Sequence, residues 1–331
     1  MNQLLRGKHI LLLCLLLPPV CLALAIVSGS QPLEWLFSTD IGQTVLWQIR
    51  LPRVFMAFLI GASLAGAGVL IQGVVRNPLA DPGLIGVSGG AAVGAALFVV
   101  LTAAGLTLPF WGQSLMAFVG GFAALMVVMR LGFSGSSLQA MSFLILAGIA
   151  VNVMASALIG LLSYVATDDA LRQITFWSLG SLAAADWHWV IAMSLLLLAA
   201  CFYWPTRLRA LDALLLGDVE ARSMGVSVGR MQLIVVIWVA LLVALSVSAS
   251  GVIGFVGLIS PHLARLLTGA SHRRVMPLAV VLGGCLLVAA DTLSRTLIAP
   301  AELPIGIVTT LLGAPLFIAL MMREKRRLAW Q

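Results

Sequence analysis

Charged residues are scarce in this 331-residue sequence: Asp, Glu, Lys and Arg make up 9% of it, whereas hydrophobic residues make up 61%. A soluble domain has about a quarter charged and about half apolar residues, so the composition excludes a soluble globular protein. The mean hydropathy of +1.11 comes from recurring apolar runs of about 20 residues, the length that crosses a bilayer as a helix. A transmembrane barrel would show alternating strands of about ten residues instead. The sequence therefore predicts an integral membrane protein made of helices.

Motifs for ATP hydrolysis and for metal catalysis are absent. There is no G-x-x-x-x-G-K-S/T phosphate loop and no H-E-x-x-H pair, so we predict no catalytic residue and no metal site. Any use of ATP then requires a separate subunit. The cysteines lack metal-site spacing and fall in apolar runs, so we expect buried thiols. They are Cys14, Cys21, Cys201 and Cys285. The net charge of +7 is typical of basic cytoplasmic loops rather than of a nucleic-acid partner.

The apolar runs predict an all-α polytopic membrane protein with ten transmembrane helices in a single domain, residues 1–331. The spans are expected at about 10–28, 53–75, 84–104, 111–130, 142–165, 187–205, 231–250, 252–267, 276–294 and 305–322. The eighth span is short and contains Pro261, so it is expected to be broken or only partly inserted.

The N-terminal run allows two interpretations. Arg6 and Lys8 precede it, and Ala23-Leu24-Ala25 resembles a signal-peptidase site, which is the pattern of a secretory signal. The ten-span topology works best if the segment is retained, so we expect it to be the first span.

Basic residues set the orientation, because cytoplasmic loops are enriched in Lys and Arg. Ten spans place both termini, the 206–230 loop and the 265–274 turn on one side, and these segments hold most of the basic residues. We therefore predict cytoplasmic termini. Arg50, Arg53, Arg172 and Arg295 remain on the outer side.

Arg50 and Arg53 open the second span in the segment "QIRLPR". One interpretation is that they lie at the lipid–water interface and anchor the helix. The other is that they form an exposed docking site for an acidic partner, since the planar guanidinium pairs well with carboxylates.

The segment "LDALLLGDVEARSMGVSVGRM", residues 211–231, is amphipathic and lies in the 206–230 cytoplasmic loop. Two short helices broken by Gly217 and Gly225 fit this pattern. A partly apolar, charged cytoplasmic element indicates a surface for a protein partner. The alternative is an interfacial helix that lies on lipid.

Three polar residues interrupt the spans: Gln72, Asn152 and Asp291. Polar groups are costly in lipid, so these side chains are expected to hydrogen-bond between helices or to line a pathway. The segment "NPLADPGLIGVSGGAAVG", residues 77–94, begins with two prolines around Asp81 and predicts a rigid corner after the second span.

Two other classes of membrane protein match parts of the sequence less well. Intramembrane serine proteases use a G-x-S-G tetrad, and 86–89 and 132–135 match it, but His9, His188 and His262 all lie near predicted span ends. A stand-alone secondary transporter needs a coupling-ion site at the bilayer midplane, and the spans lack an acidic cluster.

Several segments together resemble one known family. Glu220-Ala221 followed by Gly225 is similar to the E-A-A-x-x-x-G coupling loop of bacterial ABC importer permeases, with Arg222 in place of the second alanine. The segments "QIRLPR", "NPLADPGLIGVSGGA", "GFVGLISPHLAR" and "ELPIGIVTTLLGAPLF" resemble the iron-siderophore, haem and vitamin B12 permeases, the type II ABC importers. The resemblance runs from about residue 48 to 317, nearly the whole chain.

This resemblance implies a permease in the bacterial inner membrane, surrounded by lipid and paired with a second permease copy. It also implies two cytoplasmic ATPase subunits, which hold ATP and Mg²⁺, and a periplasmic substrate-binding protein. No cofactor is expected on this chain itself. A homodimer is expected, although one chain permits a heterodimer, and the resting direction of the cavity stays open.

The resemblance also implies roles for particular residues. Arg50, Arg53 and Arg295 match arginines that contact glutamates on the two lobes of the binding protein. The expected ATPase-coupling residues are Leu215, Gly217, Glu220, Ala221, Arg222 and Gly225. A rough alignment places a cytoplasmic gate at Ala140, Met141 and Ser142, at the start of the fifth span.

The segment "LRQITFWSLGSL", residues 171–182, is more similar to haem permeases than to the vitamin B12 branch. We therefore expect haem as the substrate, with a ferric siderophore or vitamin B12 as the alternative. No residue is assigned to substrate contact.

Overall fold

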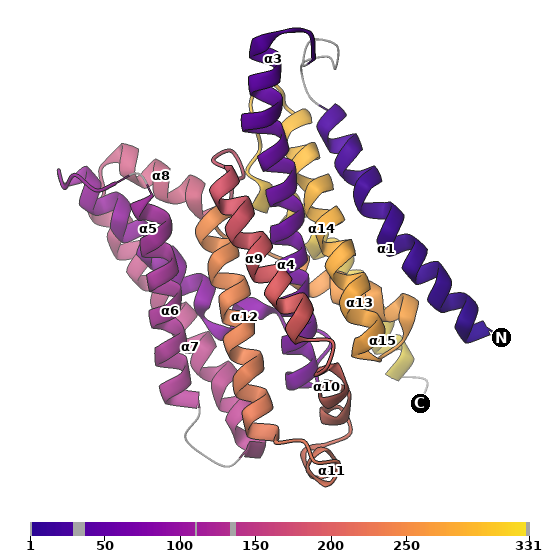
Figure 1. The fold of residues 1–331 in the computed structure, drawn as a ribbon. Coiled ribbons are helices and arrows are strands. Elements are labelled where there is room, and N and C mark those ends of the chain that lie inside the picture. The colour runs from indigo at the N-terminus through magenta and orange to yellow at the C-terminus, as the bar shows by residue number, and fades with distance from the viewer. Residues whose placement is uncertain (1, 29–36, 110, 133–136, 329–331) are drawn as a thin grey trace.

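The computed structural model of the protein describes residues 2–28, 37–109, 111–132 and 137–328, and the regular elements in these ranges are helices (Figure 1). The longer ones are α1 (Asn2–Val27), α4 (Leu51–Val75), α5 (Val87–Ala103), α6 (Gly112–Gly132), α7 (Ser137–Val165), α9 (Trp187–Tyr203), α12 (Val228–Ser250), α13 (Val256–Thr268), α14 (His272–Thr296) and α15 (Ile305–Leu328). The shorter ones are α3 (Asp40–Val45), α8 (Asp168–Ser178), α10 (Leu208–Leu214) and α11 (Asp218–Ser223), with a π turn at Leu46–Arg50 and a 3₁₀ turn at Pro82–Ile85.

Each predicted span overlaps one of the longer helices, and the prediction of an all-α polytopic membrane fold is confirmed. Within the described residues, five helical segments are long and apolar enough to cross a membrane alone, and α9 with α10 would make a sixth if this bent pair is one span. Three further apolar helical stretches are shorter than a full span: Cys14–Val27, Val87–Ala103 and Ile305–Ala319. The start of α1 and the end of α15 lie toward the same end of the molecule as α10 and α11 (Figure 1). The number of ten spans and the cytoplasmic termini stay predictions.

Helix α4 lies at the centre of the bundle and packs against α9, α12, α13 and α14 (Figure 1). Its small residues make this possible. A side chain at Gly61 would overlap the carbonyl oxygen of Gly283 in α14, and one at Gly68 would overlap that of Gly257 in α13. Membrane helices associate through such close packing, because lipid supplies no hydrophobic driving force between them. The α4–α14 pair therefore forms a tightly packed unit.

Two elements were not predicted from the sequence. Helix α8 begins after Thr167, whose hydroxyl accepts a hydrogen bond from the N–H of Ala170 (3.4 Å). Two aspartates in its first turn also favour a helix start. Helix α3 and the π turn extend the second predicted span back to Asp40.

The eighth predicted span contains only a 13-residue helix, α13, with Pro261 inside it. This helix is too short to cross a bilayer core of about 30 Å.

The prediction of four buried thiols is wrong for Cys201, whose side chain is exposed on α9. Cys285 is buried, and Cys14 and Cys21 are partly buried. Composition alone could not make this distinction, because a membrane helix is apolar on its outer face as well as on its packed face.

Candidate docking and coupling sites

Arg53, in the first turn of α4, lies between two carboxylates. Its Nε and Nη2 atoms contact Oδ1 of Asp291 at 3.0 and 2.9 Å. Its Nη1 and Nη2 atoms contact Oε1 and Oε2 of Glu302 at 3.0 and 2.9 Å. The Asp291 side chain is 2% exposed, whereas that of Glu302 is 43% exposed. Arg53 therefore pairs with one buried carboxylate, Asp291, and one exposed carboxylate, Glu302. It makes two contacts to each, and paired contacts of this kind fix the orientation of the guanidinium group.

The other two arginines of this cluster bind the end of α1. Arg295 donates from Nε to Oδ2 of Asp291 (3.0 Å) and from Nη2 to the carbonyl of Ala25 (3.2 Å). Arg50 donates from Nη1 to the carbonyl of Ile26 (3.1 Å). The last carbonyls of a helix lack partners within the helix, so these two guanidinium groups stabilise the C-terminal end of α1.

The three predicted docking arginines thus lie in one cluster, but Arg50 and Arg53 are not exposed, as one of their two interpretations required. Arg50 is 7% exposed, Arg53 is 8% exposed, and the Arg295 side chain is 11% exposed. We call these three arginines, with Asp291 and Glu302, the outer cluster. Its net charge is 3 − 2 = +1. Its role in docking stays a prediction, to which the structure adds Glu302 as the accessible carboxylate.

At the opposite end of the bundle, the 206–230 loop contains α10 and α11 as the two predicted short helices. Gly217 lies between them with φ +129°, and Gly225 follows α11 with φ +82°. Glycine adopts these backbone angles without the strain that a Cβ atom would cause. A side chain at Gly217 would in addition overlap the carboxylate of Glu220. The two glycines therefore fix the geometry of the loop.

Ion pairs attach α10 and α11 to the bundle. Asp218 of α11 is buried and pairs with Nη2 of Arg76, the residue that caps the C-terminus of α4. Ala221 of α11 is fully buried, so the helix rests on the bundle through this face. In α10, Asp212 accepts a hydrogen bond from the N–H of His272 (2.8 Å) and lies 2.6 Å from its ring Nδ1. The loop is thus fixed to the ends of α4 and α14.

The other face of this element carries exposed apolar side chains. Leu215, Leu216, Val219 and Met224 are all exposed on this face. Glu220 and Arg222 are exposed among them. An apolar patch with charged residues around it is typical of a protein interaction surface. Helix α11 lies at the tip of the molecule (Figure 1), and its role in coupling stays a prediction.

The polar residues inside the spans hydrogen-bond within the bundle. Gln72 donates to the carbonyl of Ala80 (3.1 Å) and accepts from Nη1 of Arg265 (2.5 Å). Asn152 of α7 donates to the carbonyl of Gly83 (3.0 Å). With the Arg53 cluster, these contacts favour helix–helix bonding over a pathway for all three predicted polar residues.

Two of these bonds, to the carbonyls of Ala80 and Gly83, also hold the rigid corner that was predicted in the segment 77–94. Asp81 accepts a hydrogen bond from the N–H of Gly83 (2.7 Å) and caps the 3₁₀ turn. Burial raises the pKa of Asp81, and this backbone bond opposes the shift. Asn77 caps the preceding turn by accepting from the N–H of Leu79 (2.9 Å). The connection from α4 to α5 is therefore well ordered.

The structure assigns no function to the remaining sequence candidates. Ala140, Met141 and Ser142 belong to the first turns of α7, where Met141 is buried and Ser142 exposed, and their gate role stays a prediction. Within the described ranges, the partners of His188 and His272 are aspartates and not Ser88, and Ser134 lies outside these ranges. The same ranges contain no group of three His, Cys, Asp or Glu side chains that could hold a metal ion.

Sequence reasoning missed four residues that hold the two sites: Arg76, Asp212, Asp218 and Glu302. Each is a charged residue next to an apolar run, which is a signal that something pairs with it. Spacing could not identify the partners, because Arg76 and Asp218 are 142 positions apart and Arg53 and Glu302 are 249 apart.

The chain is similar to known transport proteins along nearly its whole length. The model of the FecCD transport family matches residues 10–323. The hemin transport system permease protein HmuU of Yersinia pestis is 42% identical over 298 residues, or 88% of each chain. The vitamin B12 import system permease protein BtuC of Klebsiella pneumoniae is 38% identical over 325 residues, or 97% of this chain and 96% of the relative.

A solved structure agrees with these relatives. It is described as an inward-facing conformation of a proposed metal-chelate type ABC transporter, and its chain is 33% identical with a TM-score of 0.86. The match covers 96% of this chain and 99% of that one. The chain therefore belongs to the FecCD transport family and is a multi-pass permease subunit of an ABC importer.

Proposed function

We propose that this permease moves haem, or a related iron chelate, from the periplasm to the cytoplasm. The observation that carries the choice of substrate is the 42% identity with the hemin permease, against 38% with the vitamin B12 permease. A ferric siderophore or vitamin B12 is the alternative. The mechanism is alternating access in the bacterial inner membrane, by a homodimer of this chain with two ATPase subunits and a periplasmic binding protein.

The binding protein docks at the outer cluster of Arg50, Arg53 and Arg295. The cluster's net charge of +1 attracts an acidic surface, and such charges set orientation and encounter rate more than affinity. Because Arg53 is already paired, docking proceeds by exchange. A carboxylate of the binding protein replaces the exposed Glu302, while the buried Asp291 keeps its contacts.

The ATPase subunits bind ATP and Mg²⁺ and contact the exposed face of α10 and α11, which includes Leu215 and Glu220. Motion of this element acts on α4 through the pair Arg76–Asp218, and on α14 through Asp212. Both helices reach the outer cluster at their far ends. The predicted gate at 140–142 opens on the dimer axis when these helices tilt.

Growth tests the choice of substrate. We expect a bacterial strain without a haem permease to grow on haem as sole iron source when it carries this chain with its ATPase and binding protein. Growth on a ferric siderophore but not on haem would contradict the choice and keep the family. Uptake that needs no ATPase subunit would indicate a secondary transporter instead.

The coupling role has its own test in the same strain. We expect Glu220→Ala combined with Gly225→Ala to abolish growth on haem while the chain still reaches the membrane. Unchanged growth and unchanged ATPase activity would contradict the assignment of the loop.

A further inference from the structure

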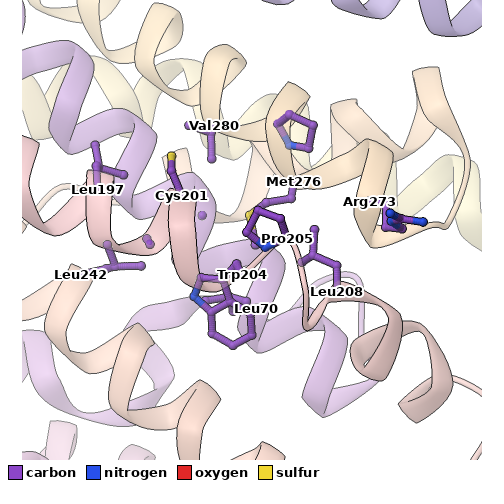
Figure 2. A pocket seen from close by; sticks show the side chains of 13 residues that line it. Leu70, Leu197, Cys201, Trp204, Pro205, Leu208, Leu242, Arg273, Met276 and Val280 are labelled. Carbon is purple, nitrogen blue, oxygen red and sulfur yellow. The ribbon is translucent and has the colours of Figure 1, made fainter.

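An apolar cavity of about 360 Å³ lies in the bend between α9 and α10, and Figure 2 shows the side chains around it. Helices α9 and α10 meet at an angle of 70°. The inside of this bend is closed by α4 and α14, which contribute Leu70 and Met276, while Trp204 and Leu208 come from the bend itself. The volume is in the range of about 300–1,000 Å³ that is common for small-molecule sites.

One face of α14 makes one end of the cavity charged and the rest apolar. Arg273, Met276, Pro277 and Val280 line it at positions i, i+3, i+4 and i+7, so they form one stripe along the helix. The stripe has a cation at its start and only apolar side chains beyond it. Figure 2 shows Arg273 at one edge of the cavity and Leu197 toward the opposite side.

The charged end of this stripe has no partner among the residues that the structure describes. Arg273 is exposed, and no hydrogen bond or ion pair joins it to any residue in the described part of the chain. Trp204 lines the cavity with its indole ring and adds no polar atom that a ligand could reach, because its Nε1 is fully buried.

We propose that this cavity binds an anionic glycerophospholipid, with the phosphate on Arg273 and an acyl chain along the α14 stripe. The lining fits an acyl chain because it is almost wholly apolar, and Arg273 supplies a complementary charge for the headgroup. In the proposed orientation, this end of the bundle faces the cytoplasm, so the lipid belongs to the cytoplasmic leaflet.

The location links such a lipid to the coupling element. Leu208, which lines the cavity, is the first residue of α10. Four residues further on, Asp212 binds His272, the neighbour of Arg273. A lipid in the bend therefore supports the docking of α10 on α14, the same contact through which the ATPase subunits are proposed to act.

Native mass spectrometry of the whole permease–ATPase complex tests the proposal, with equimolar phosphatidylglycerol and phosphatidylcholine as probes. We expect the wild type to retain one phosphatidylglycerol per permease chain in preference to phosphatidylcholine. Arg273→Gln should weaken this retention roughly fivefold, the effect of about one basic residue near an anionic headgroup. Arg274→Gln is the matched control, because Arg274 is also exposed but does not line the cavity.

A second variant fills the cavity without touching the charge. Ala200 lines the cavity, and Ala200→Phe is expected to abolish retention of both lipids. Thermal unfolding of each complex verifies that it is folded. Equal retention of phosphatidylglycerol by wild type and Arg273→Gln would overturn the proposal. So would a wild type that retains both lipids equally.

Discussion

Arg53 and Arg76 lie at the two ends of α4, and each is held by a buried aspartate from another helix. Arg53 pairs with Asp291 of α14, and Arg76 pairs with Asp218 of α11. The 25 residues of α4 make a helix about 37 Å long. The helix packs against α14 without room for a methyl group at Gly61. The proposed docking and coupling sites are therefore joined by one stiff element.

The ion pair between Arg76 and Asp218 is expected to be essential for coupling. Arg76→Gln leaves Asp218 buried without its partner, which costs about 1–3 kcal/mol of unfolding free energy. We expect a lower melting temperature, and ATP-driven uptake that falls more than ATPase activity does. Arg230→Gln, at an exposed arginine at the start of α12, is the control. Equal uptake by both variants would contradict the link between α11 and α4.

The glycine after α11 is required by its backbone angle. Gly225 has φ +82°, and a side chain there would meet nothing within 4 Å, so strain is the only penalty. We expect Gly225→Ala to destabilise the protein by about 1–2 kcal/mol. Gly229→Ala, in open space and in the first turn of α12, should be neutral or stabilising. Thermal unfolding in detergent compares the two, and equal shifts would argue against the strain.

The contact of α4 with α14 is expected to tolerate no added volume. Gly61→Ala forces a methyl group onto the backbone of Gly283, and overpacking of this kind costs about 1–3 kcal/mol. Gly66→Ala lies on the same helix, but its added atom would be 3.6 Å from Val280, an ordinary contact. We expect only the first variant to melt at a lower temperature. A matching loss in Gly66→Ala would indicate a general effect of helix composition.

Glu302 is expected to compete with the binding protein. Glu302→Gln raises the net charge of the outer cluster from +1 to +2 and frees one side of Arg53. We expect the loaded binding protein to associate faster with the complex in nanodiscs, more so at low salt than at high salt. Unfolding free energy should change by less than about 1 kcal/mol, because the pair is partly exposed. Identical association rates at low salt would contradict docking at Arg53.

Much of this architecture could be predicted from the sequence, because each membrane helix appears in it as a long apolar run. Runs such as 53–75 and 231–250 overlap α4 and α12, and Gly217 and Gly225 correctly marked the ends of the short helices. Helix α8 escaped because it is short and amphipathic, and α3 because it continues into α4 through a π turn.

What the sequence could not supply is which charges meet. Arg50 and Arg53 were assigned to one side of the membrane from the count of basic residues, and that count says nothing of burial. Asp291 was recognised as costly in lipid, but its pairing with two arginines depends on how α4 and α14 pack. Pairing depends on the fold, and in the outer cluster each of the three arginines has a partner within the protein.

The most direct measurement is ATP-driven uptake of haem into liposomes that hold the permease, its ATPase and the loaded binding protein. We predict that the wild type accumulates haem and that Arg50→Glu combined with Arg53→Glu loses uptake. Because Arg53 pairs with the buried Asp291, basal ATPase activity and the melting temperature of the variant complex must show that it is still folded and assembled. A complex that accumulates vitamin B12 or a ferric siderophore but no haem would contradict the proposed substrate. Equal haem uptake by both proteins would contradict docking through these arginines.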